Sequence, residues 1–87
     1  EAAARWRVLE EVVESRGWPD RLVIALEQSI IGGTDRSKYE REAGISTATA
    51  SNDFRRLLDA GLVVQSGRGR STRYFASEEL RRRVTGA

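Results

Sequence analysis

Apolar residues recur at helical spacing through the first two thirds of the chain. Between residues 2 and 16 they form one stripe, which predicts a helix with a buried face made of Trp6, Leu9, Val12 and Val13. Gly17 ends this helix, and Asp20, which follows Pro19, is expected to cap a second helix that stops before Gly32. The inward side of the second helix is formed by Leu22, Ala25, Leu26 and Ile30.

Two shorter segments then predict a pair of helices joined by a tight turn. The first is expected to run from its N-cap Asp35 to Ala43, with Gly44 as the left-handed residue that ends it and Ser46 as the cap of the next helix. In that next helix, over residues 47–60, the inward positions are Ala50, Phe54, Leu57 and Leu58. The opposite face carries small and polar side chains: Thr47, Ala48, Ser51, Asn52 and Arg55.

After Gly61 the pattern changes to that of a β-hairpin. Residues 62–64 predict one strand, residues 66–70 the tip and residues 71–76 the returning strand, with Gly67 and Gly69 allowing positive φ angles. Ser77 is expected to cap a final helix. The order of elements predicts an α+β winged helix-turn-helix, mostly helical with a two-stranded β wing. We assign residues 1–17 to an N-terminal helix or linker and residues 18–87 to a winged-helix, DNA-binding-like domain.

Charge is distributed unevenly although the net charge of the 87 residues is only +2. Residues 1–53 hold seven basic and ten acidic side chains, whereas residues 54–87 hold eight arginines and three acids. The basic half contains the second helix of the motif, the wing and the C-terminal tail. A one-sided positive field favours a polyanionic partner on that side, although a solvated surface is the alternative.

The absence of cysteine and histidine removes several kinds of chemistry. Disulfides, thiolate zinc sites, thiol nucleophiles and imidazole bases are excluded, so we expect no catalysis and no cofactor in this chain. The Gly67–Arg70 loop joins two strands rather than leading into a helix, which argues against a nucleotide-binding glycine loop there. No apolar run approaches the about 20 residues that span a bilayer, and no signal peptide is visible; we expect a cytoplasmic protein and no membrane partner.

With no catalysis and no cofactor expected, the function that the arginines and polar residues favour is contact with nucleic acid, most simply double-stranded DNA. Wing arginines can pair with phosphates or enter a minor groove, and Asn52 can read adenine. The candidate contact residues are Ser46, Thr47, Ser51, Asn52, Arg55, Arg56, Arg68, Arg70 and Arg73. Asp53 would repel phosphate if it faced outward, and we expect it to pair with Arg56 or Arg41 instead.

The alternative is a protein-docking or dimerisation module that binds no nucleic acid. Trp6 and Trp18 are its distinguishing feature, because exposed indoles suit a surface that packs on another domain or on a second copy. A homodimer through the first helix is compatible with both interpretations.

Several short motifs in residues 20–76 resemble the C-terminal winged-helix domain of bacterial Fic (filamentation induced by cyclic AMP) proteins. They are Ser37-Lys38-Tyr39, Gly44-Ile45-Ser46, Thr49-Ala50-Ser51, Asp53-Phe54, Leu57, Gly61-Leu62 and, most specifically, Gly69-Arg70-Ser71-Thr72-Arg73-Tyr74. The helix-turn-helix pattern alone is also found in other regulators, including those of the multiple-antibiotic-resistance type. If that is the correct family, this chain is a fragment of such a regulator.

The resemblance implies an accessory module for DNA binding, autoregulation or target docking. Members of that family carry an upstream catalytic domain that transfers AMP to protein hydroxyls through a histidine-containing loop, and no histidine occurs here. The first helix would continue the helix that links the two domains. The start of the chain, without Met and in the middle of a helical pattern, also suggests a domain excised from a longer protein.

Overall fold

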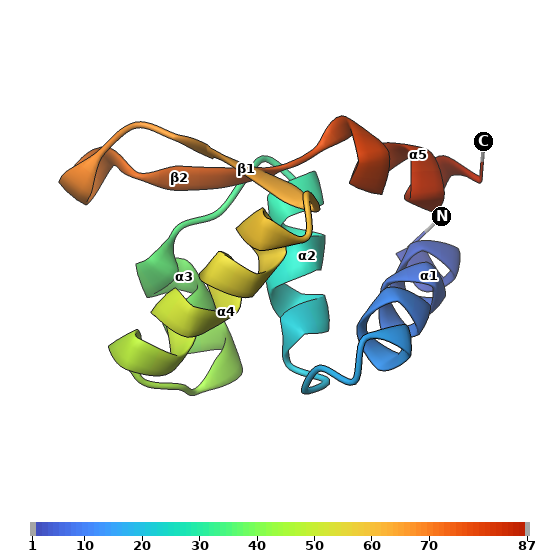
Figure 1. Ribbon diagram of the computed structural model, residues 1–87, viewed down its shortest axis with the longest axis horizontal. Helices are drawn as coiled ribbons and strands as arrows, with labels where there is room; N and C mark the ends of the chain where they lie inside the picture. Colours follow the sequence, from blue (N-terminus) through green and yellow to red (C-terminus); the bar gives the residue numbers. More distant parts are fainter. Residues whose placement is uncertain (1, 87) are drawn as a thin grey trace.

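The computed structural model describes residues 2–86 and has the expected α+β architecture, with five α-helices and a two-stranded antiparallel sheet (Figure 1). The elements are α1 (Ala2–Ser15), α2 (Leu22–Ile30), α3 (Arg36–Ala43), α4 (Thr47–Asp59), β1 (Val63–Ser66), a 3₁₀ turn η1 (Gly69–Ser71), β2 (Arg73–Ala76) and α5 (Glu78–Thr85). The α3–turn–α4 pair followed by the β1–β2 hairpin confirms the predicted winged helix-turn-helix class. We call the hairpin, residues 63–76, the wing.

α2, α3 and α4 lie on one side of the hairpin, with α2 in the middle of the molecule, and α5 continues from the end of the hairpin (Figure 1). The tip of the wing projects at one end of the long axis, beyond α3 and α4, while α1 and α5 pack together at the other end, near both termini. None of the helices in residues 2–86 is long and apolar enough to cross a bilayer.

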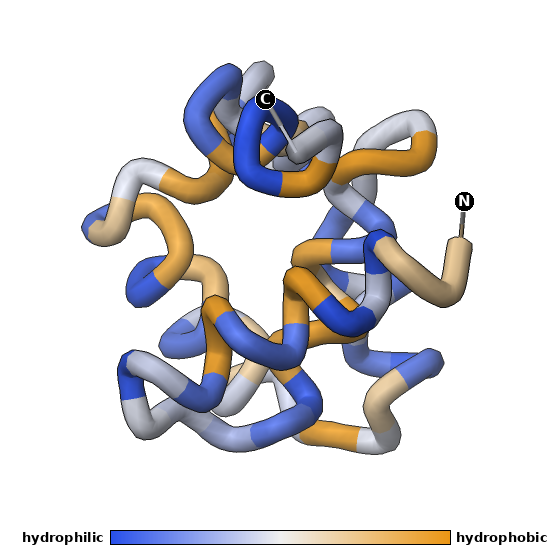
Figure 2. The backbone as a smooth tube through the Cα atoms, turned by 90° about the vertical axis from the view of Figure 1, so that its right-hand side faces the viewer, coloured by the Kyte–Doolittle hydropathy of each residue, from blue (hydrophilic) through white to orange (hydrophobic). Residues whose placement is uncertain are grey.

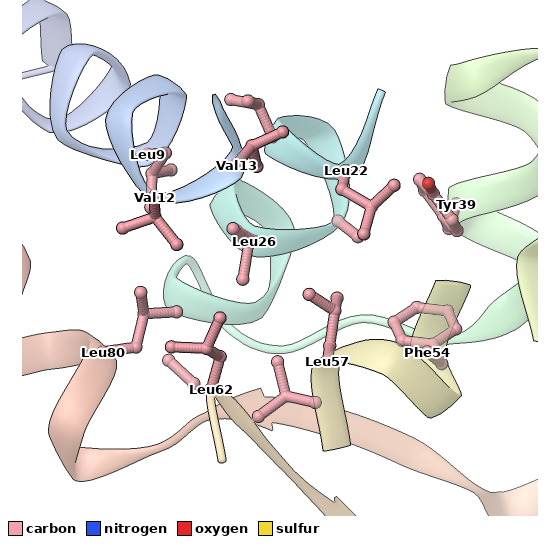
Figure 3. Packing of buried hydrophobic residues seen from close by; sticks show 14 of the residues in the cluster. Leu9, Val12, Val13, Leu22, Leu26, Tyr39, Phe54, Leu57, Leu62 and Leu80 are labelled. Atoms are coloured by element: carbon pink, nitrogen blue, oxygen red, sulfur yellow. The ribbon is translucent and has the colours of Figure 1, made fainter. Parts of the chain in front are cut away.

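One hydrophobic core joins all five helices (Figure 3). α1 contributes Leu9, Val12 and Val13 to this core, so the segment assigned to residues 1–17 packs with the rest of the chain. Trp6 departs from the predicted buried stripe: it is 39% exposed, because α1 turns only the later part of its stripe toward α2 and α5. Hydrophobic and hydrophilic positions alternate along the helices, as one-sided burial requires (Figure 2).

The predicted N-caps are confirmed for three helices. The side chains of Asp35, Ser46 and Ser77 accept hydrogen bonds from backbone amides at the start of α3, α4 and α5. The expected cap at Asp20 is wrong. The amides of Leu22 and Val23 donate to the backbone oxygens of Pro19 and Asp20 at 3.1 and 3.0 Å, so the chain enters α2 through a tight turn without a side-chain cap.

The wing is fixed to the helices at two places. Thr34, just before α3, forms an isolated antiparallel bridge with Tyr74, in which each amide donates to the other residue's oxygen at 2.9 and 2.8 Å. This bridge, which the sequence pattern did not predict, puts β2 between Thr34 and β1. The ring of Tyr74 also stacks on Phe54 of α4, with centroids 4.0 Å apart and planes within 7°. The wing and α4 are therefore held in one orientation.

A buried carboxylate connects the helix-turn-helix to the start of α2. Asp53 is 1% exposed and accepts hydrogen bonds from Arg21 at 2.7 and 3.1 Å and from the Tyr39 hydroxyl at 2.6 Å. The expected pairing with Arg56 or Arg41 is therefore wrong, because Asp53 lies on the inner side of α4, facing α2 and α3. The hydrogen bond to Asp53 raises the pKa of Arg21, and burial raises the pKa of Tyr39 above its ordinary value.

We expect Asp53→Ala to lower the free energy of unfolding by about 2–3 kcal/mol, because it leaves the Tyr39 hydroxyl and a mostly covered Arg21 without their acceptor. Tyr39→Phe, which removes one of the three hydrogen bonds, should cost about 1–2 kcal/mol. Urea denaturation followed by circular dichroism measures both effects. Asp59→Ala, at an exposed position of the same helix, is the matched control and should cost less than about 0.5 kcal/mol. Equal losses for Asp53→Ala and Asp59→Ala would contradict a stabilising role for the buried carboxylate.

Candidate nucleic-acid interface

The turn between α3 and α4 has the geometry that its residues predicted. Gly44 adopts φ 67° and ψ 43°, and its amide donates to the Glu40 oxygen at 2.8 Å. The Ser46 hydroxyl oxygen accepts from the Thr49 amide at 3.1 Å. These two caps end α3 and start α4 within three residues, which leaves the N-terminal turn of α4 at the surface.

The outward face of α4 is small and polar, as predicted. Thr47, Ala48, Asn52 and Arg55 are exposed, and Ser51 is half-buried. Arg56 is exposed too, but it follows Arg55 by one residue and so projects about 100° further round the helix axis. The Thr47 hydroxyl donates to the Glu40 carboxylate at 3.2 Å. From Thr47 to Leu58 this face carries no carboxylate, since Asp53 is turned inward.

The tip of the wing presents Arg68 and Arg70 to solvent, and neither forms an ion pair with any residue in the described range. Its shape depends on Gly67, which has φ 81° and whose Cβ, if present, would clash with the Ser71 carbonyl oxygen. The chain then turns through η1, so the returning strand begins at Arg73 rather than at Ser71 as expected.

Arg73 differs from the arginines of the tip. Its guanidinium lies 3.3 Å from the Asp35 carboxylate, 3.5 Å from the Gly32 oxygen and 5.9 Å from the centroid of the Phe75 ring. The same Asp35 caps α3 by accepting from the Lys38 amide at 2.8 Å. Arg73 thus ties the base of the wing to the start of α3, and its charge is partly neutralised within the chain.

A groove of about 730 Å³ runs between α3 and the wing. Its lining includes Arg36 and Arg41 of α3 together with Arg70 of η1. Sequence reasoning missed Arg36 and Arg41, because α3 has nearly balanced charge and nothing local reveals that the wing passes beside it. The complete lining of this α3–wing groove is Asp35, Arg36, Ser37, Arg41, Gln65, Gly69, Arg70, Thr72 and Tyr74.

The basic residues of the C-terminal half do not form a single surface. α5, which carries Arg81, Arg82 and Arg83, packs on α1 at the opposite end from the tip of the wing (Figure 1). Arg82 and Arg83 also pair with Glu78 and Glu79. The expected common field of α4, wing and tail is therefore wrong for the tail. Residues 35–76 alone hold eight basic and five acidic side chains, a net charge of +3.

The arrangement offers hydrogen-bond donors and positive charge. Among residues 2–86 there is no group of three or more His, Cys, Asp or Glu side chains that could hold a metal ion.

No protein-family model matches this chain, and no curated protein matches it in sequence. The resemblance to the Fic-family winged helix therefore stays a prediction from the motifs.

We expect Asp35→Ala to lower the free energy of unfolding by about 1 kcal/mol, because it removes the N-cap of α3. Asp35→Asn keeps a capping oxygen and loses only the exposed pair with Arg73, so it should cost less than about 1 kcal/mol. Thermal and urea denaturation compare the two variants. A larger loss for Asp35→Asn than for Asp35→Ala would contradict this division between cap and ion pair.

Proposed function

We propose that this chain is a winged-helix domain that binds double-stranded DNA, with α4 in the major groove and the wing on the flanking backbone. The observation that supports this most strongly is the separation of charge on α4 and the wing. The one acid in the first twelve residues of α4, Asp53, is buried and bonded to Arg21. Arg55, Arg68 and Arg70 are exposed and have no carboxylate partner within the part of the chain that the structure describes. Such a surface attracts phosphate without an opposing charge at its centre.

The side chains of α4 fit the requirements of base reading. A helix approaches the groove floor closely only where its outward residues are small, and Ala48 and Ser51 meet that condition. Asn52 and Arg55 follow on the exposed side, where an amide can pair with adenine and a guanidinium with guanine. Ser46 and Thr47 lie at the positive end of the α4 dipole, where phosphate is favoured, and the Thr47 hydroxyl would exchange its hydrogen bond to Glu40 for one to phosphate. Arg56 reaches the backbone on one flank.

We further propose, from the motif resemblance alone, that the domain serves a longer bacterial Fic-family protein as a regulatory module. An AMP-transferring catalytic domain would then lie upstream of α1, and the protein would act in the cytoplasm, where chromosomal DNA is accessible. The chain itself supplies no histidine for that reaction.

A second candidate function, docking on another domain or a second copy, is favoured by Trp6. Its indole is 39% exposed on α1, at the end of the molecule away from the wing. Trp18 supports this candidate less, because it is half-buried against the core with the Arg16 guanidinium 5.4 Å from its ring centroid. Trp6 is therefore the more exposed of the two tryptophans.

Arg68→Ala/Arg70→Ala should weaken binding to all duplexes alike and reduce the slope of log K against log salt by up to about two units, since two phosphate contacts are lost. Fluorescence anisotropy of a labelled random duplex, titrated over a series of salt concentrations, measures both quantities. Arg81→Ala/Arg82→Ala removes the same charge from α5 and should leave the slope nearly unchanged. Equal affinity and slope for the wing variant and the native chain would remove the wing from the interface.

The docking alternative predicts self-association through α1 that Trp6→Ala abolishes, because the substitution removes the exposed indole. Sedimentation velocity over a concentration series detects the association. Trp18→Ala is not a suitable control, because Trp18 packs on the core and its loss would disturb the fold. Val64→Ala, which shortens an exposed side chain on the wing, is the control instead. A monomer at every concentration would rule out dimerisation.

A further inference from the structure

The α3–wing groove brings together three arginines whose charge the described residues neutralise only in part. Arg36, Arg41 and Arg70 line it, and within residues 2–86 only Arg36 of these three has an ion pair, with Glu40 at 3.4 Å. The single acid in the lining is Asp35, whose oxygens already accept from the Lys38 amide and from Arg73. Three arginines from two separate segments therefore line a shared space, in which an anion bound by their guanidinium groups would replace solvent.

The rest of the lining is suited to a flat, hydrogen-bonding ligand. Gln65 and Tyr74 are directly paired across the wing, so their side chains lie next to each other on the same face of the hairpin. The Tyr74 ring is held in place by its stack on Phe54, and the hydroxyls of Ser37 and Thr72 complete the lining. A fixed aromatic ring beside an amide is a common way to hold a nucleic base.

A DNA backbone alone would use only part of this chemistry. Phosphates can use the guanidinium groups and the Gln65 amide, but they do not stack on the face of an aromatic ring such as that of Tyr74. The volume of about 730 Å³ falls within the range of roughly 300–1,000 Å³ found for small-molecule sites. We propose that the groove binds a free nucleotide, with its phosphates on Arg36, Arg41 and Arg70 and its base against Tyr74 and Gln65.

This site differs from the glycine loop that the sequence argued against. There, phosphate would be held by backbone amides leading into a helix; here, side-chain guanidiniums from α3 and η1 hold it. Gly69 lines the groove but leads to a strand. Arg70 belongs both to this groove and to the wing surface assigned to DNA. Nucleotide and duplex would thus compete for Arg70, and this competition, unlike the nucleotide site itself, rests on the proposed function.

The test is a titration of the ¹⁵N-labelled chain with ADP, followed by amide chemical shifts. We expect shifts concentrated at Ser37, Gln65, Gly69 and Thr72, and weaker binding of pyrophosphate, which carries the charge without the base. Arg36→Ala/Arg41→Ala should weaken ADP binding by about tenfold or more. Both residues are exposed, so the variant should keep the native amide spectrum outside the groove.

The matched control is Arg81→Ala/Arg82→Ala. In each double variant one arginine is paired with a glutamate four residues away, Arg36 with Glu40 and Arg82 with Glu78. The other, Arg41 or Arg81, has no carboxylate partner in the described range. The control thus removes the same kinds of charge, but from α5. The control should bind ADP as the native chain does. Shifts that fall outside the groove, equal losses in both double variants, or pyrophosphate binding as tight as ADP binding would each overturn the nucleotide site.

A second arm separates this proposal from the DNA proposal. ADP should displace a labelled duplex from the native chain, because both need Arg70. Duplex binding that ADP does not affect, with ADP shifts present in the groove, would overturn the competition. Groove shifts from ADP in a chain that binds no duplex even at low salt would support the nucleotide site and reject the DNA function, so the two failures are distinguishable.

Discussion

The carboxylate of Asp53 is the point on which the orientation of the helix-turn-helix depends. It lies on the inner side of α4 and accepts hydrogen bonds both from the guanidinium of Arg21, just before α2, and from the hydroxyl of Tyr39 on α3. Hydrogen bonds are directional, so three of them to one buried group hold the rotation of α4 more narrowly than the apolar contacts would alone. A buried ion pair is by itself weak evidence for net stability. In this chain its geometry turns the only acid in the first twelve residues of α4 away from solvent.

The same constraint extends to the wing through one aromatic contact. Phe54 follows Asp53 on α4, packs edge-on against Tyr39 and stacks on Tyr74 of β2. Tyr74 is also bridged through its backbone to Thr34, just before α3. The two elements assigned to DNA, α4 and the wing, are therefore positioned by adjacent residues of a single helix turn. A change in the rotation of α4 would move the wing with it.

Local sequence patterns predicted the elements of this fold and most of their ends. Asp35, Ser46 and Ser77 each cap a helix by accepting a hydrogen bond from an amide three residues further along the chain. Because these contacts are local, they could be predicted without the tertiary structure. The partner of Asp53 was not, because Arg21 is 32 residues away and its approach depends on how α2 packs on α4. Trp6 was misplaced for a related reason: periodicity identifies a stripe but not how much of its length a partner covers.

In the candidate interface, too, the sequence could not predict which charged residues lie together in the fold. Counting arginines in the C-terminal half suggested one basic side, yet α5 carries three of them to the far end of the molecule and Arg73 is engaged by Asp35. Arg36 and Arg41, in a helix of mixed charge, gain significance only because the wing returns beside α3. What a polyanion meets is therefore set by which guanidiniums the fold leaves unpaired. Among residues 2–86, guanidiniums without an ion pair lie at the tip of the wing, on α4 and in the α3–wing groove, and also at Arg7 of α1 and Arg81 of α5, away from the wing. A ligand that engages Arg70 in the groove removes charge from the surface assigned to DNA.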